Sequence, residues 1–143
     1  MSVKKVYAED LPYFMTGKSS AESWREKAEV EIKRAGCVVT SSGDIHQNGQ
    51  SAVFIGFSVD GEAFRVAFPV LESKRDNVKA AKIQSATMMF YDIKARCVAL
   101  RVLGARVAFG GYRILPDGRT DGQVSTPELA AALPKMLVGG GAE

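Results

Sequence analysis

Four basic residues gather at the start of the longest predicted helix, in the segment Ser73-Lys74-Arg75-Asp76-Asn77-Val78-Lys79-Ala80-Ala81-Lys82. Arg75, Lys79 and Lys82 stand at positions i, i+4 and i+7 and therefore share one face of a helix. The positive end of the helix macrodipole disfavours cations there, so their presence indicates a bound anion. Free backbone N–H groups at a helix start also suit a phosphate. Together with Lys74, these residues predict phosphate binding.

Other basic and aromatic residues extend this prediction to a nucleic acid. Arg65 lies on the outer face of a predicted hairpin, and Tyr13 and Phe14 lie in an N-terminal arm, where their rings could stack on bases. Cations that follow a phosphate backbone bind with little regard for sequence. We therefore expect a nucleic-acid-binding protein of low specificity, with DNA favoured over RNA and single-stranded DNA favoured most. The alternative is a plain solvated surface, because Glu72 and Asp76 neutralise part of the charge.

A metal-dependent nuclease is a further alternative, because the same segment contains the triplet Glu72-Ser73-Lys74. Nucleases of the PD-(D/E)xK type use two acids to hold Mg²⁺ and a lysine to position the attacking water. Asp44 is the candidate for the second acid. The triplet follows Pro69 at the end of its strand, where its side chains are expected in solvent. His46 is the one histidine of the chain, so neither zinc nor a Ser-His-Asp arrangement is expected. We predict no enzymatic activity and no cofactor.

The long helix also carries a second apolar strip besides the seam that faces the core. This strip comprises Ala81, Met88, Ala95 and Ala99, whose small or adaptable side chains suit a protein contact. Two interpretations stay open, namely packing against a C-terminal helix of this chain, or contact with a second copy or a host protein. An inhibitor or adaptor that binds a host protein is therefore the second candidate function.

Length and composition indicate one globular domain. The 143 residues are 46% hydrophobic and 24% charged, with a net charge of +3, which permits an acidic partner without requiring one. No stretch of 18 apolar residues predicts a membrane span, and the first ten residues lack the apolar core of a signal peptide. Cys37 and Cys97 are expected as buried thiols, although a disulfide between them stays open. We therefore expect a cytoplasmic protein without membrane contact.

The first half of the chain predicts an arm, a helix and three strands. Residues 1–18 form the arm, either docked on the core or mobile. A helix follows over 21–35, with a capping box at Ser19 and Glu22 and a C-terminal Gly36. A short strand is predicted over 37–41 and a polar loop over 42–50. Alternating apolar residues over 53–59 and 64–70 flank Asp60-Gly61, the dipeptide typical of a type I′ hairpin.

The second half predicts a long helix, a strand and a short helix. The helix spans 77–103, because apolar residues recur at 3-4-3-4-3 spacing from Ile83 to Leu100, and Gly104 ends it. A strand is predicted over 106–115, with Val107, Phe109 and Tyr112 inward, followed by a turn at 116–118. A capping box predicts a helix over 127–133. The fold class is therefore α+β, a two-layer sandwich spanning residues 19–138, with a flexible tail at 139–143.

The second half resembles a family of small proteins of unknown function from bacteriophages and prophages. The resemblance is carried by Ile93-Lys94-Ala95, Gly104, Ala108-Phe109 and Leu115-Pro116-Asp117-Gly118-Arg119-Thr120. It implies a phage or mobile-element protein and no mechanism. The order helix, three strands, helix is also similar to the double-stranded-RNA-binding domain. In that comparison Gly43-Asp44-Ile45-His46 takes the place of the first loop between strands, and Ser73-Lys74-Arg75 that of the basic helix start.

Overall fold

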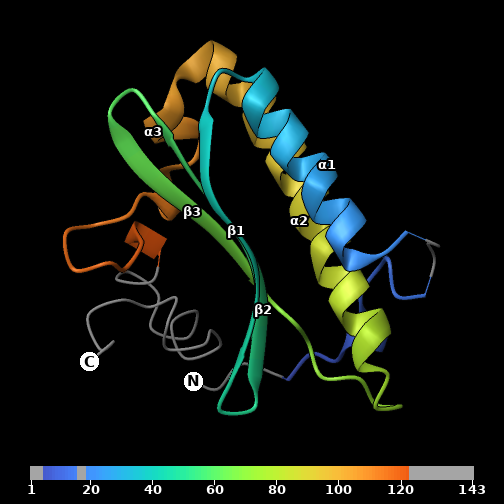
Figure 1. The fold of residues 1–143 in the computed structure, drawn as a ribbon. Helices are drawn as coiled ribbons and strands as arrows, with labels where there is room; N and C mark the ends of the chain where they lie inside the picture. Colours follow the sequence, from blue (N-terminus) through green and yellow to red (C-terminus); the bar gives the residue numbers. More distant parts are fainter. Residues whose placement is uncertain (1–4, 16–18, 123–143) are drawn as a thin grey trace.

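A computed structural model describes residues 5–15 and 19–122. Three antiparallel strands form a twisted sheet, and two long helices lie side by side over one of its faces (Figure 1). The predicted α+β two-layer class is therefore confirmed. The predicted helix at 127–133 and the tail at 139–143 lie outside the described residues.

The first helix, α1 (Ala21–Arg34), ends and packs as its sequence predicts. Ala28 and Ile32 are fully buried, while Trp24 and Ala35 pack partly buried against the core. Gly36 adopts φ +91, the left-handed conformation that glycine favours after a helix. The predicted cap is wrong by one residue, because the side chain of Ser20, not Ser19, accepts the hydrogen bond from the Ser23 N–H.

The sheet consists of β1 (Val38–Gln47), β2 (Gln50–Val59) and β3 (Glu62–Pro69), in the order β1-β2-β3. Both turns have two residues with positive φ, Asn48-Gly49 and Asp60-Gly61, as type I′ hairpins require. The predicted polar loop over 42–50 is wrong. β1 continues to Gln47 because each residue from Ser42 to Gln47 has a partner in β2, and a bulge between Val39 and Ser41 sets the register.

Gly43-Asp44-Ile45-His46 therefore lies inside β1 and not in a loop. This placement brings His46 opposite Ser51 of β2 in the antiparallel pairing.

The core fills the space between the sheet and the helices. Alternating residues of the β2–β3 hairpin face it as predicted, and the rings of Phe57 and Phe64 stack at 5.6 Å between centroids. Phe109 meets Phe57 edge-on at 4.9 Å. From α2, Met89 and Ile93 are completely buried in the same cluster.

The long helix α2 (Val78–Leu103) begins one residue later than predicted, because Asn77 is its N-cap and accepts the Ala80 N–H. It ends at Gly104. The predicted strand over 106–115 is wrong. The chain forms the short helix α3 (Ala105–Ala108) and the 3₁₀ turn η2 (Gly110–Tyr112). Helical winding lets Phe109 reach the core while Val107 stays exposed, and the strand-like pairing of this segment is limited to isolated bridges at Arg113 and Ile114.

The N-terminal arm is docked on α2 over the part that the structure describes. Its 3₁₀ turn η1 (Ala8–Asp10) lies beside the fully buried Gln84 of α2. The Gln84 amide nitrogen donates to the carbonyls of Ala8, Leu11 and Pro12, and the ring of Tyr13 stacks on Tyr91 of α2. This matches the interpretation in which the aromatics dock the arm.

The cysteines and the helices bear on two further sequence predictions. Cys37 and Cys97 are buried free thiols, as predicted, and form no disulfide. No helix within residues 5–15 and 19–122 is both long and apolar enough to cross a bilayer.

Candidate functional site

Two of the four cations predicted at the start of α2 are paired with carboxylates. The Lys74 ammonium lies 3.2 Å from Asp10 and over the ring of Tyr7. The Lys82 ammonium lies 2.7 Å from the carboxylate of Asp44 on β1. These exposed pairs leave two of the four predicted cations with their charge compensated within the chain.

Two backbone amides in the loop that precedes α2 have a carboxylate of the chain as their partner. Glu9 of η1 accepts hydrogen bonds from the Ser73 hydroxyl at 2.6 Å, the Lys74 N–H at 2.9 Å and the Arg75 N–H at 3.3 Å. Desolvation raises the pKa of Glu9, but these hydrogen bonds outweigh it and lower that pKa to about 2. A carboxylate of the arm thus accepts hydrogen bonds from the loop that leads into α2.

Two cations of the segment remain available. Arg75 and Lys79 are exposed, and no carboxylate among the described residues pairs with either side chain. Lys79 lines a shallow cavity of about 220 Å³ together with Met15 and Ile83. The cationic surface at the start of α2 is therefore smaller than the sequence predicts.

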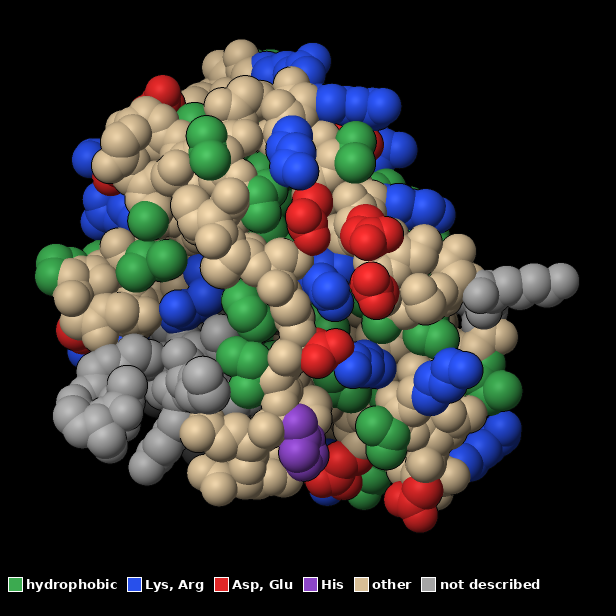
Figure 2. Space-filling model, in the orientation of Figure 1, with side chains coloured by type: hydrophobic (Ala, Val, Ile, Leu, Met, Phe, Trp, Pro, Cys, Tyr) green, Lys and Arg blue, Asp and Glu red, His purple; other side chains and the backbone are tan. Residues whose placement is uncertain are grey.

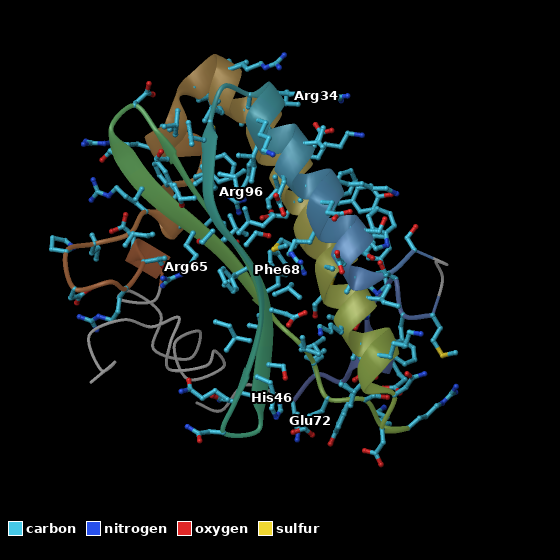
Figure 3. The ribbon with its side chains drawn as sticks, in the orientation of Figure 1. Arg34, His46, Arg65, Phe68, Glu72 and Arg96 are labelled. Carbon is cyan, nitrogen blue, oxygen red and sulfur yellow. The ribbon has the colours of Figure 1, made fainter. Side chains whose placement is uncertain are left out.

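The remaining predicted binding residues lie elsewhere. Arg65 projects from β3 on the side of the sheet away from the helices and donates to the Gly118 carbonyl at 3.0 Å (Figure 3). Burial lowers the pKa of its guanidinium group. Tyr13 is stacked on Tyr91 at 5.4 Å, and Phe14 is half-buried. Arg65 and Tyr13 are thus engaged within the chain, while Phe14 precedes Met15, which lines the cavity beside Lys79.

Acidic and basic side chains alternate over much of the visible surface (Figure 2). Red and blue atoms interleave through the middle of this face. Blue atoms gather along the edge that covers the upper ends of α1 and α2. On this face, basic side chains therefore gather at the C-terminal ends of the helices.

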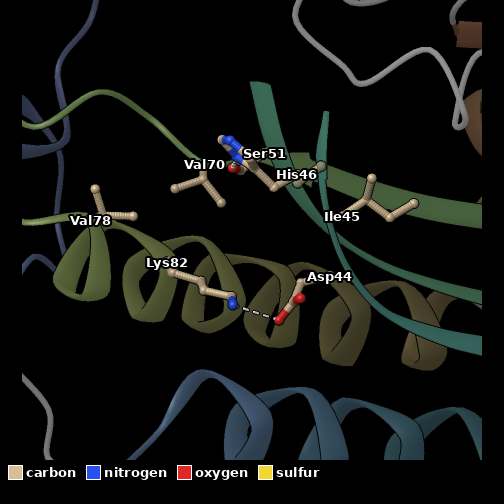
Figure 4. A pocket seen from close by; sticks show the side chains of 8 residues that line it. Asp44, Ile45, His46, Ser51, Val70, Val78 and Lys82 are labelled. Atoms are coloured by element: carbon tan, nitrogen blue, oxygen red, sulfur yellow. Dashed lines mark hydrogen bonds and ion pairs between the residues drawn. The ribbon is translucent and has the colours of Figure 1, made fainter. Parts of the chain in front are cut away.

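A pocket of about 190 Å³ lies between the β1–β2 hairpin and the start of α2 (Figure 4). His46 and Ser51 face each other across the two strands and share a hydrogen bond between Nδ1 and Oγ. A catalytic Ser-His pair needs a third group that orients the imidazole. Asp44 lines the same pocket, but its carboxylate is bonded to Lys82, 2.7 Å away. The pair is explained as a cross-strand hydrogen bond of an exposed hairpin.

The sequence did not single out Ser51, because its contact with His46 depends on the register of β1 and β2. The Asn48-Gly49 dipeptide was the signal that could have found it. A two-residue hairpin turn centred there places residues 46 and 51 opposite each other.

The residues of the predicted nuclease triplet also have other partners. Glu72 forms an ion pair with the Lys5 ammonium at 2.7 Å, and Lys74 forms an ion pair with Asp10. Asp44 is bonded to Lys82. Within the described ranges, no three or more His, Cys, Asp or Glu side chains are grouped so that they could hold a metal ion.

The clearest unexplained surface is an apolar strip on α2. Tyr91, Ala95, Val98 and Val102 recur at 4-3-4 spacing and all are exposed, with Val98 65% and Val102 78% accessible. We call these four residues the α2 strip. The ring of Tyr91 is in part covered by Tyr13 of the arm and by Trp24 of α1, so the unexplained part of this surface is at Val98 and Val102. Of the strip predicted from the sequence, Ala95 alone belongs to the α2 strip. Ala81 is completely buried and Met88 and Ala99 are half-buried, so the free face is rotated from the predicted one.

A cationic groove borders the α2 strip where α1 and α2 end. It has a volume of about 220 Å³ and is lined by Val98 of the strip and by three cations and one acid, namely Arg34, Lys94, Arg101 and Glu31. Figure 3 shows Arg34 at the end of α1, on the outer side of the helix. We call this feature the α1–α2 groove.

Comparisons with known proteins identify no relative of this chain. No protein-family model, no curated protein and no solved structure matches it.

Proposed function

We propose that the protein acts without catalysis, by binding another protein through the α2 strip. The observation that carries this proposal is the exposure of large apolar side chains in a single line. Isolated surface hydrophobics are ordinary, but a contiguous apolar face marks an interaction site. Val98 and Val102 stand one turn apart on the same face, and Leu103 and Val107 follow with 58% and 66% of their surface accessible.

The position of the strip supports the same function. α2 already buries its opposite face against the sheet through Met89 and Ile93. Packing within the described part of the domain therefore does not explain why Val98 and Val102 are apolar. A partner that covers them would remove this apolar surface from water, which is the main favourable term in protein association. Such a role corresponds to the inhibitor or adaptor expected as the second candidate from the sequence.

A quantitative affinity purification tests the proposal. The tagged chain and its Val98→Ser/Val102→Ser variant are each used as bait in extract of the cells that encode the protein. We expect at least one protein to be enriched by the native chain and lost with the variant. Val30→Ser is the matched control, because Val30 is a valine of α1 with 45% of its surface accessible. An identical set of proteins with all three baits would contradict the proposal.

Nucleic-acid binding is the second candidate function, favoured by Arg75 and Lys79. Both cations are exposed and lie within one turn of the start of α2, where backbone binding with low sequence specificity was expected. Single-stranded DNA stays the favoured ligand. Lys74 and Lys82 form ion pairs with Asp10 and Asp44, so this surface would contact fewer phosphates than the four cations alone suggest.

A gel shift with an oligonucleotide at several salt concentrations tests this second candidate. Arg75→Glu/Lys79→Glu should lower the slope of log affinity against log salt by about 1.4, since each phosphate contact on a single strand contributes about 0.7. Lys27→Glu/Lys33→Glu makes the same change of charge on α1 and is the control. Equal slopes for both double variants would contradict it. The nuclease alternative is tested by incubating the protein with plasmid and Mg²⁺, where intact plasmid would remove it.

A further inference from the structure

The two flanks of the α2 strip differ in charge. Lys94 and Arg101 stand seven residues apart, so both lie along the flank that faces α1. The opposite flank carries Asp92 and Ala99, and the Asp92 carboxylate is bonded to Arg96 at 2.9 Å. One flank is therefore cationic and the other is close to neutral.

Arg34 of α1 adds a third cation to the cationic flank. Its backbone carbonyl accepts a hydrogen bond from the Arg101 guanidinium at 3.2 Å, which holds the two helix ends together. Its side chain is 70% exposed and lies 3.7 Å from Glu31, the one acid that lines the α1–α2 groove. Three cations thus face one carboxylate beside the exposed Val98.

Helix dipoles account for part of this charge. Arg34 and Arg101 lie in the last turns of their helices, where the negative end of the macrodipole favours cations. Lys94 lies nine residues before the end of α2, beyond the reach of this effect. Its ammonium lies over the Phe90 ring, 5.8 Å from the centroid, and Lys94 stays exposed beside the α2 strip.

A second copy of this chain does not complement the surface. In an antiparallel pair of α2 helices, the two-fold axis places each flank against its own equivalent, so Lys94 and Arg101 would face Lys94 and Arg101. In a parallel pair they would face Ala99 and Asp92, whose carboxylate is already occupied by Arg96. Neither arrangement supplies free acids to the cationic flank.

We infer that the partner presents an amphipathic helix whose apolar face covers the α2 strip and whose acidic flank lies over the α1–α2 groove. This inference rests on the proposed protein-binding function and names the chemistry of the partner. From Tyr91 to Val102 the strip covers eleven residue steps, or about 16 Å along the axis. A partner helix of three to four turns would cover it, in the helix-on-helix mode with i, i+3, i+4 and i+7 anchors. The flanking charges would fix its orientation.

A displayed library of helical peptides tests this inference with the full-length protein. Each peptide has a constant apolar face, and its flanking positions vary among Glu, Lys and Gln. Selection on the native chain should enrich Glu along one flank about two- to tenfold, the range for one or two exposed ion pairs. Selection on Lys94→Glu/Arg101→Glu should instead enrich Lys. Lys27→Glu/Lys33→Glu is the control and should retain the preference for Glu.

Each result supports or overturns a defined part of the proposal. Peptides that bind through Val98 and Val102 without any charge preference would overturn the acidic partner and leave the protein-binding function intact. A selection that yields no peptide sensitive to Val98→Ser/Val102→Ser would overturn both. If Lys94→Glu/Arg101→Glu abolished oligonucleotide binding while no peptide was selected, the groove would be a nucleic-acid site and the inference would be wrong.

Discussion

Replacing Val98 and Val102 together by serine tests whether the α2 strip is uncovered in the free protein. Fully burying an apolar side chain of this class contributes about 1.5–3 kcal/mol, and valine, as the smallest of its members, lies at the lower end. Only about a third of Val98 and about a fifth of Val102 is covered. Valine and serine have similar helix propensities. The double substitution should therefore lower the free energy of unfolding by about 1 kcal/mol at most.

Ile93→Ala on the same helix provides the comparison. Ile93 is completely buried in the core cluster, and removing a buried isoleucine side chain costs about 2–5 kcal/mol. One substitution on the buried face should thus destabilise the protein more than two on the exposed face.

Urea unfolding measured by tryptophan fluorescence distinguishes these outcomes. Trp24, the one tryptophan of the chain, packs 5.4 Å from the Phe90 ring of α2 and reports on the contact between the helices. If the free energy of unfolding of the double serine variant falls about as far as that of Ile93→Ala, the strip is packed in solution. The α2 strip would then be no docking surface, and the proposed function would fall.

Three further predictions concern the arm and the core. Gln84→Ala should lower the free energy of unfolding by about 1–3 kcal/mol, because the carbonyls of residues 8, 11 and 12 lose a buried donor. Limited proteolysis should then cut the arm. The Glu9 carboxyl should titrate near pH 2 by NMR. Its pKa is lowered in the folded state, so its stabilising effect is present above about pH 4.5 and lost as the pH falls through 2. The Cys97 thiol, whose pKa burial raises to about 11, should resist a thiol reagent until urea unfolds the protein, and its stabilising effect should be lost as the pH rises from 9 through 11.

Each of these predictions has a contradicting outcome. An arm equally resistant to protease in the native protein and in Gln84→Ala would show that the amide does not hold it. If the Glu9 carboxyl titrates with a midpoint above pH 4, the hydrogen bonds from Ser73 and the following amides do not form in solution. Rapid labelling of Cys97 in the native protein would contradict its burial.

The fold could be predicted where the chain has strong local signals. Asp60-Gly61 between two alternating apolar runs specifies the β2–β3 hairpin, and the apolar spacing from Ile83 to Leu100 specifies α2. Polar composition concealed the extension of β1 over 42–47, because these residues pair through their backbones. Around Phe109, a β-like pattern of apolar residues folds as a short helix, which places the Phe109 ring against Phe57 five residues after Gly104.

The candidate site was harder to predict because it depends on contacts between distant segments. Lys74 and Lys82 are paired with Asp10 and Asp44, which lie 64 and 38 positions away in the sequence. The exposed face of α2 depends on where α1 and the sheet pack, and this cannot be read from the spacing of one helix. A helical wheel alone therefore misplaced the free strip.

Site-specific photo-crosslinking tests the central claim most directly. The photoreactive residue p-benzoylphenylalanine is placed at position 98 or, as the control, at position 30, and the protein is irradiated in the cells that encode it. We expect a discrete adduct with a different protein at position 98 and none at position 30. The absence of any adduct at 98, or an adduct with a second copy of this chain, would contradict the proposed function.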